Sequence, residues 1–165
     1  MQQPDDYTIQ QTNDPAHFSE GAGMMVTTDP WITLGADYEN CLASFDGPCK
    51  EIYVIHRGNE MAGFIILQVC GSFNGYIQTI CIKETYRGKG LGKKLLQFAE
   101  ERIHWNSPNV FICVSGFNKQ AMKLYLESGF EIVGVLKDFI KKGFDELLLR
   151  KTIGPRSGYK PGKNE

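Results

Sequence analysis

Short runs of apolar and β-branched residues, separated by polar turns, predict several strands in the first half of the chain. Residues 52–56 and 61–69 form two such runs around a tight polar turn, a pattern typical of a hairpin. A glycine-containing turn then leads into a third run at 76–82, and a weaker alternation at 7–9 predicts a strand near the start. This half of the chain therefore predicts an antiparallel sheet.

Further along the chain the hydrophobic pattern changes to a helical period. Leu91, Leu95 and Ile103 fall on one face of a helix with charged residues opposite, and Pro108 prevents this helix from running on. The next run, 110–114, is apolar throughout, which is typical of a strand buried on both faces. We therefore expect a helical crossover that leads to a parallel strand pair.

The remaining segments complete a mixed sheet. Helical spacing appears in pieces between residues 17 and 45, interrupted by an Asp-Pro pair. Asn118 is expected to cap a helix that stops at Gly129, and two strands, 131–140 and 144–151, are expected to follow it. The order of strands, helix, strand, helix and hairpin predicts an α/β (α+β) fold.

The composition is that of an ordinary globular protein. The chain has 165 residues, of which 42% are hydrophobic and 22% are charged, and this suits one hydrophobic core. We expect a single domain over residues 1–153. A flexible tail is expected over 154–165, because that segment is rich in proline and glycine.

The charge and the length of the apolar runs argue against two classes of partner. The formal net charge is -1, so bulk attraction to nucleic acid or to an anionic membrane is not expected. No apolar run approaches the roughly 18 residues of a membrane span. The polar, acidic start of the chain also differs from a signal peptide. We therefore expect a cytoplasmic protein with no nucleic-acid or membrane partner.

The cysteines and histidines predict neither a disulfide framework nor a metal site. The five cysteines are odd in number, widely spaced and without a C-x-x-C motif. The three histidines are scattered, with no second ligand-type residue at helical or turn spacing. Reduced thiols and no bound metal are expected.

The loop before the central helix has the features of an anion site. It consists of Arg87, Gly88, Lys89, Gly90, Leu91 and Gly92. Glycines let a backbone approach a ligand closely, and a helix start offers unpaired N–H groups with about half a unit of positive charge. Lys93 and Lys94 add charge, which makes a diphosphate more favourable than a lone carboxylate. A glycine-rich turn with solvated lysines remains the alternative for this segment alone. Neither a Walker loop nor a dinucleotide fingerprint has this glycine spacing.

A second motif lies on the next predicted helix. Asn118, Ala121 and Tyr125 share one helix face, because three or four residues separate each from the next. The segment 118–130 follows the pattern N-x-x-A-x-x-x-Y-x-x-x-G-F. Together with the R-G-x-G-x-G loop at 87–92, it resembles the two signature segments of the GNAT acetyltransferase superfamily. The resemblance is good from about residue 52 to 151 and poor over the first fifty residues.

The resemblance implies a fold, a co-substrate and a set of binding residues. It implies the GNAT fold, with about seven strands, about four flanking helices and a sheet splayed at strands 4 and 5. It also implies acetyl-coenzyme A as co-substrate, with the pyrophosphate on the glycine loop, the pantetheine arm on the splayed strand, and an N–H near Ile82 facing the developing oxyanion. The residues implied for coenzyme binding are Ile80, Cys81, Ile82, Arg87, Gly88, Lys89, Gly90, Leu91, Gly92, Asn118, Ala121 and Lys123.

The same resemblance implies one catalytic residue and leaves another open. Tyr125 would lie beside the sulfur and protonate the departing thiolate, which a phenol with a pKa of about 10 can do. Many family members carry a carboxylate where this chain has Gln78, and relatives that acetylate ribosomal-protein N-termini carry Glu where it has Cys113. The candidates for the general base stay open between a water chain and Glu39, Asp46, Glu60 and Asp138.

The acceptor is the least determined part of the sequence-based hypothesis. We expect a primary amine of a small molecule or of a peptide or protein N-terminus, in a pocket formed by residues 29–45 and the closing hairpin. Direct attack is favoured over a cysteine acetyl-enzyme. Three alternatives stay open: a catalytically weak coenzyme-binding regulatory module, transfer of a longer acyl group, and a homodimer.

Overall fold

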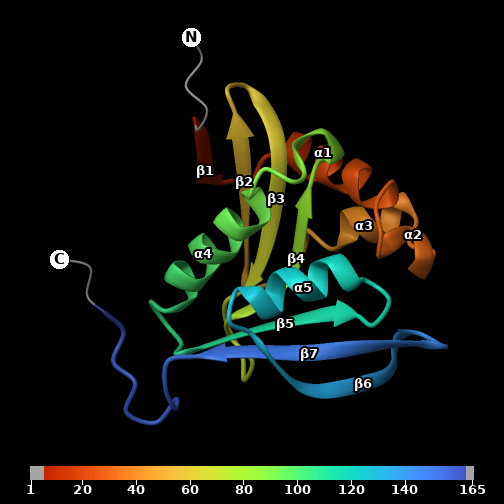
Figure 1. Ribbon diagram of the computed structural model, residues 1–165. Helices are drawn as coiled ribbons and strands as arrows, with labels where there is room; N and C mark the ends of the chain where they lie inside the picture. Colours follow the sequence, from red (N-terminus) through yellow and green to blue (C-terminus); the bar gives the residue numbers. More distant parts are fainter. Residues whose placement is uncertain (1–5, 163–165) are drawn as a thin grey trace.

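Seven strands form one sheet with helices on both faces (Figure 1), in a computed structural model that describes residues 6–162. The strand order is β1-β2-β3-β4-β5-β7-β6, and β4 with β5 is the parallel pair among otherwise antiparallel neighbours. This confirms the predicted mixed α+β fold. The strands are β1 (Tyr7–Gln11), β2 (Lys50–Arg57), β3 (Glu60–Gln68), β4 (Tyr76–Ile82), β5 (Asn109–Ser115), β6 (Glu131–Lys141) and β7 (Phe144–Thr152).

The helices form two layers, one on each side of the sheet (Figure 1). One side packs α1 to α3 over Phe64 and Ile66, and the other packs α4 and α5 over Ile65 and Leu67. As expected, the N-terminal helical region is in pieces, and Asp29-Pro30 and Asp37 divide it into three helices. The helices are α1 (Pro15–Val26), α2 (Trp31–Leu34), α3 (Tyr38–Ala43), α4 (Leu91–Ile103) and α5 (Lys119–Glu127), with a short 3-10 turn, η1 (Glu84–Tyr86).

The parallel pair of strands separates soon after it begins. β4 and β5 are in register only at Tyr76 with Phe111 and at Ile77 with Ile112. Beyond this point β4 continues to pair with β3, and β5 pairs with β7 as far as Ser115. The backbone edge of β4 after Ile77 therefore has no strand beside it on the β5 side, which is the expected splay between strands 4 and 5.

The expectation of reduced thiols is wrong for two cysteines, because Cys49 and Cys70 form a disulfide. The β2–β3 register places Lys50 opposite Gln68, so the residues just outside the hairpin face each other with Cα atoms 5.6 Å apart. A separation of 21 residues does not reveal this proximity until the hairpin register is known. The three cysteines without a disulfide are Cys41, Cys81 and Cys113.

Removing this disulfide is expected to destabilise the fold without touching the cavity described below. For a Cys49→Ser/Cys70→Ser variant, the free energy of unfolding should fall by about 3 kcal/mol, the loop-closure entropy for a link of this length. Urea unfolding without reductant measures the difference. With reductant present the two proteins should unfold at the same urea concentration, and equal stability without reductant would contradict the assignment.

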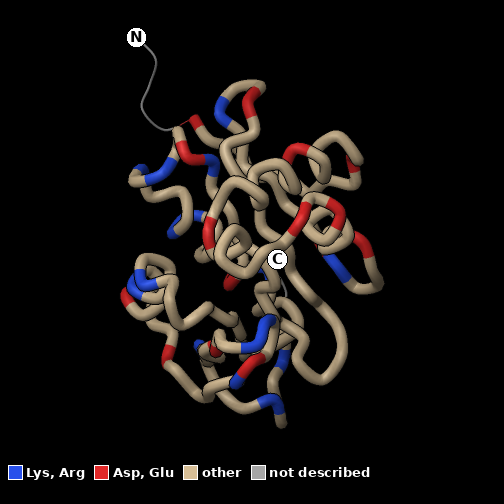
Figure 2. The backbone as a smooth tube through the Cα atoms, turned by 90° about the vertical axis from the view of Figure 1, so that its right-hand side faces the viewer, with Lys and Arg blue, Asp and Glu red and all other residues tan. Residues whose placement is uncertain are grey.

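Within residues 6–162, no helix is long and apolar enough to span a membrane. Basic and acidic residues are interspersed along the backbone (Figure 2).

After β7, the Tyr159 hydroxyl donates to the His104 carbonyl, and the Arg156 guanidinium donates to the Ser72 carbonyl at 3.3 Å. The start of the expected domain, 1–5, and the end of the expected tail, 163–165, lie outside the described residues.

Candidate active site

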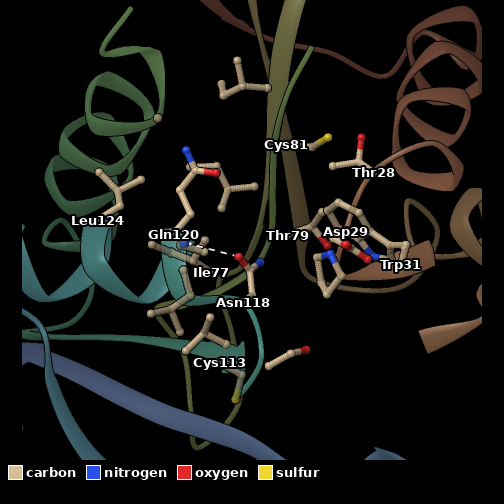
Figure 3. Close-up of a pocket in the computed structure, with 18 of the residues that line it drawn as sticks. Thr28, Asp29, Trp31, Ile77, Thr79, Cys81, Cys113, Asn118, Gln120 and Leu124 are labelled. Carbon is tan, nitrogen blue, oxygen red and sulfur yellow. Dashed lines mark hydrogen bonds between the residues drawn. The ribbon is translucent and has the colours of Figure 1, made fainter. Parts of the chain in front are cut away.

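A cavity of about 1100 Å³ lies where β4 and β5 separate. Its walls come from β4, from the segment that joins α1 to α2, from the glycine loop with the first turn of α4, and from α5. In Figure 3, Thr28 and Trp31 lie on one side of the splayed strands, and Gln120 and Leu124 lie on the other. The cavity therefore brings together both sequence motifs and the N-terminal region that the sequence left undetermined.

The glycine loop begins α4 in a conformation that requires glycine at two positions. Gly88 and Gly90 have φ angles of 72° and 78°, in the left-handed region that residues with a Cβ rarely adopt. Gly90 is the N-cap of α4, and no side chain caps the helix, so its first N–H groups remain available at the cavity wall. Gly92 also lines the cavity and leaves little room for a side chain, because a Cβ there would lie 3.1 Å from Leu124 Cδ2. The glycine therefore lets α4 approach α5 closely.

The basic side chains around the loop divide into two groups. Arg87 and Lys93 line the cavity. The Arg87 guanidinium also joins the loop to the α1–α2 segment, because its Nε donates to the Ile82 carbonyl at 3.0 Å and its Nη2 donates to Thr28 Oγ1 at 2.9 Å. This contact fixes the loop against the opposite wall. The Lys94 ammonium lies away from the cavity, 5.6 Å from the centre of the Tyr7 ring.

The structure brings most of the expected coenzyme-binding residues to this cavity. Lys89 does not line it, because its ammonium donates to the Thr85 carbonyl at 3.2 Å. Lys123 does not line it either, and pairs along α5 with Glu127 at 3.8 Å. The expected residues that do line the cavity are Ile80, Cys81, Ile82, Arg87, Gly88, Gly90, Leu91, Gly92, Asn118 and Ala121.

One face of α5 turns toward the cavity. Asn118 caps the helix, and its Oδ1 accepts a hydrogen bond from the Ala121 N–H at 3.3 Å, the dashed line in Figure 3. Two turns further along, Tyr125 lines the cavity with only 5% of its surface exposed, and its ring packs near Phe130. Burial, and then the neighbouring Cys81 thiol, raise the pKa of the Tyr125 phenol. The phenol is therefore protonated at neutral pH and can serve as a proton donor.

A buried carboxyl group lines the same cavity, and the sequence did not identify it. Glu146, on β7, is 3% exposed and accepts a hydrogen bond from the Ser115 hydroxyl on β5. Burial raises the pKa of Glu146, and the Ser115 hydroxyl lowers it by a smaller amount. Burial also raises the pKa of Tyr76, and the next causes are Cys113, Glu146 and Tyr125. These side chains therefore form one electrostatically coupled group.

None of the carboxylates considered from the sequence lines this cavity. Glu39, Asp46, Glu60 and Asp138 are all exposed, and Glu60 instead binds the Lys83 ammonium at 2.7 Å. The Gln78 side chain does line the cavity, and its amide donates to the Ser44 carbonyl at 3.0 Å. No group of three metal-ligand side chains occurs within residues 6–162.

Apolar side chains and isolated acidic groups also line the cavity. The apolar part of the wall includes Trp31 and Ile32 of α2 and Phe139 and Ile140 of β6. Both regions in which an acceptor pocket was expected thus line the same cavity. The acidic residue on the α1–α2 segment, Asp29, accepts hydrogen bonds from the backbone N–H and the hydroxyl of Thr33.

Comparison with known proteins gives consistent matches. RimI, an N-alpha-acetyltransferase of Mycobacterium tuberculosis, is 27% identical over 144 residues, which cover 82% of this chain and 84% of that one. The L-methionine sulfoximine/L-methionine sulfone acetyltransferase of Pseudomonas aeruginosa is 28% identical over 117 residues, 66% of this chain and 68% of that one. The structure of yncA from Salmonella typhimurium with acetyl-CoA superposes with a TM-score of 0.71 at 16% identity, covering 94% of this chain and 99% of the other.

The family itself is settled by a match over most of the chain. The model of the acetyltransferase (GNAT) family matches residues 13–130, a segment that contains the glycine loop, the splayed strand and α5. It also includes the N-terminal helices, for which the sequence motifs alone showed little resemblance. The resemblance inferred from the two motifs is thereby confirmed, and the chain belongs to the GNAT acetyltransferase family.

Proposed function

We propose that this protein transfers the acetyl group of acetyl-coenzyme A to a primary amine by direct attack of the amine on the thioester. The observation that carries the proposal is one cavity lined by the uncapped start of α4, by the buried Tyr125 phenol, and by apolar and acidic side chains from α2, the α1–α2 segment, β6 and β7. Such a lining has groups for the anionic arm of a thioester and for a cationic acceptor.

The loop end of the cavity suits the diphosphate of the coenzyme. The uncapped start of α4 supplies N–H donors and the positive end of the helix dipole, and the Arg87 and Lys93 side chains add two positive charges. The unpaired edge of β4 supplies backbone groups for the amide-containing pantetheine arm, from Gln78 to Ile82. The acetyl-CoA held by the Salmonella protein of the same fold supports this assignment.

The centre of the cavity suits acyl transfer without a covalent enzyme intermediate. Burial raises the pKa of the Cys81 thiol to about 12, so a nucleophilic thiolate is scarce at neutral pH. The protonated Tyr125 phenol, by contrast, can protonate the coenzyme thiolate as the C–S bond breaks. The protonated states of Cys81 and Tyr125 therefore favour direct attack of the acceptor amine on the thioester.

Apolar and acidic side chains of the cavity favour a protonated amine attached to an apolar group. Asp29 on the α1–α2 segment and Glu146 on β7 are acidic lining residues, and the basic lining residues, Arg87 and Lys93, belong to the glycine loop and the first turn of α4. Trp31 and its apolar neighbours offer contact area to the rest of the acceptor. One similar protein is an N-alpha-acetyltransferase and the other an L-methionine sulfoximine/L-methionine sulfone acetyltransferase, so peptide α-amines and small amino acid derivatives both belong in the test.

Release of free thiol from acetyl-coenzyme A, measured with a panel of amines, tests the proposal. The panel should pair unblocked short peptides and small amino acid derivatives with the same molecules blocked at the amine. We expect thiol release with at least one unblocked amine and none with its blocked form. Calorimetric binding of coenzyme A with no release across the panel would contradict amine transfer and favour a coenzyme-binding regulatory module.

A further inference from the structure

The proposed transfer needs a group that takes the proton of the acceptor ammonium, and we propose that the Glu146 carboxylate is that group. This inference rests on the proposed function. It assigns a catalytic role to a side chain on β7, outside both sequence motifs and outside the matched segment 13–130.

The position of Glu146 is fixed relative to the other catalytic elements. β7 pairs with the full length of β5, and Glu146 lies opposite Ser115, the last residue of β5. The Gly116 N–H donates to the Asp145 carbonyl at 2.9 Å, so this pairing continues to the end of the strand. Because the Glu146 carboxyl group accepts a hydrogen bond from the Ser115 hydroxyl, the direction of the side chain is fixed as well as its depth.

The same strand end leads directly into the helix that carries the proton donor. The Asn118 N–H donates to the Ser115 carbonyl at 2.8 Å, and Asn118 then caps α5. Tyr125 lies two turns later on the same helix face. The turn from Ser115 to Asn118 thus connects the strand end beside the Glu146 carboxyl group to the helix that carries the Tyr125 phenol, and both groups line the cavity.

Glu146 differs from the other acidic groups of the cavity in being poised for proton transfer. Asp29 is occupied by two donors from Thr33, and Glu84 lies at the loop end in η1. Within the described residues, Glu146 has a single recorded side-chain hydrogen bond, from Ser115, which leaves acceptor capacity for an ammonium.

The titratable groups that interact with Glu146 in the described part of the chain carry no positive charge. Tyr76 on β4 and Cys113 on β5 both interact with Glu146, and Tyr125 on α5 interacts with Tyr76. Burial raises the pKa of all three side chains. From β6, the residue in register with Glu146 is the uncharged Leu136. Among residues 6–162, no basic side chain is one of the groups that shift the pKa of Glu146, so an incoming ammonium is attracted to the carboxylate, and a pKa raised by burial makes it a stronger base.

The proton and electron balance is closed by groups already described. Glu146 takes one proton from the ammonium, and the free amine forms the C–N bond at the thioester carbonyl. Collapse breaks the C–S bond, and the thiolate takes the Tyr125 proton. The Tyr125 phenolate is restored by the second proton of the amine nitrogen. Glu146 then returns its proton to water, so the products are amide, free thiol and one proton.

Glu146→Gln tests this role, because glutamine keeps an oxygen for the Ser115 hydroxyl and cannot take a proton. With an amine that the wild type acetylates, kcat/KM for that amine should fall on the order of 100-fold at pH 7.5. The defect should shrink above the pKa of the amine, where free amine is abundant. Glu131→Gln, exposed on β6 outside the cavity, is the matched control and should behave as wild type.

The readouts separate failure of this inference from failure of the proposed function. Wild-type rates retained in Glu146→Gln, with an unchanged pH profile, would overturn the role of Glu146 and leave acetyl transfer intact. No thiol release by the wild type with any amine would instead contradict the proposed function and this inference with it. Affinity for coenzyme A, measured by calorimetry, should be the same in both proteins.

A second test uses the wild type alone and therefore does not depend on whether a variant folds. The carboxylate is the active form of Glu146, so activity should fall as the pH drops through its pKa. The pH at which kcat/KM falls on the acidic side of the profile should be the same for two amines of different basicity. They are a peptide α-amine, with a pKa of about 8, and a lysine-type amine, with a pKa of about 10.4. A fall whose pH moves with the pKa of the amine would overturn the proposal.

Discussion

Gly90→Glu is expected to abolish useful coenzyme binding while leaving the fold intact. The new carboxylate would lie at the N-cap of α4, where the diphosphate is proposed to bind, and an added Cβ meets no atom within 4 Å. Like charges about 4 Å apart repel by about 4 kcal/mol at an effective dielectric constant of about 20. The affinity for coenzyme A should therefore fall on the order of 1000-fold, measured by calorimetry on folded protein.

A matched glycine separates the charge effect from backbone strain. Gly58, in the β2–β3 turn, also has a left-handed φ of 58° and open space around its Cα, but it does not line the cavity. Gly58→Glu should therefore show a similar loss of stability and wild-type coenzyme affinity. Gly90→Ala, which keeps the strain and omits the charge, should lose much less affinity than Gly90→Glu. Wild-type affinity in Gly90→Glu would place the diphosphate elsewhere.

Local patterns in the sequence were sufficient to predict the elements that build the coenzyme half of the site. The apolar runs at β2, β3 and β4 lie within the hairpins that the turns delimit, and the period of Leu91, Leu95 and Ile103 matches the buried face of α4. These residues are interior ones whose spacing follows from the element they occupy. The splay was expected only from the family resemblance, and the pairing of β4 with β5 bears it out.

The acidic half of the site could not be predicted from local patterns, because strand register creates it. Glu146 lies in a strand pattern like any other, and becomes a buried cavity residue only because β7 pairs with β5 and places it beside Ser115. The Cys49–Cys70 disulfide was missed for the same reason, since the register of β2 with β3 brings its ends together. Both are contacts between residues distant in sequence, which periodicity does not report.

The N-terminal wall of the cavity was also beyond local prediction. Its helices are short, and α2 has only four residues, so propensity and periodicity carry little information there. Their placement depends on packing over β3 and on contacts such as that of Arg87 with Thr28, which joins two segments 59 residues apart. The acceptor contacts proposed for this wall consequently depend on the tertiary structure.

Tyr125→Phe is expected to lower kcat about 100-fold and to leave coenzyme affinity unchanged. Phenylalanine keeps the buried ring and its packing near Phe130, and removes only the hydroxyl that would protonate the departing thiolate. The loss corresponds to about 2.7 kcal/mol of transition-state stabilisation. Steady-state thiol release measures kcat, and calorimetry with coenzyme A measures the affinity.

The control for this change is a buried tyrosine outside the cavity. The Tyr53 hydroxyl donates to Glu51 Oε2 at 2.7 Å, and burial followed by this carboxylate raises its pKa to about 12. Tyr53→Phe therefore removes the hydroxyl of another buried tyrosine and should reduce stability while leaving kcat as in wild type. If Tyr125→Phe also turned over at the wild-type rate, the proton for the thiolate would have to come from water or from Tyr76 or Tyr86, the two other tyrosines of the cavity wall.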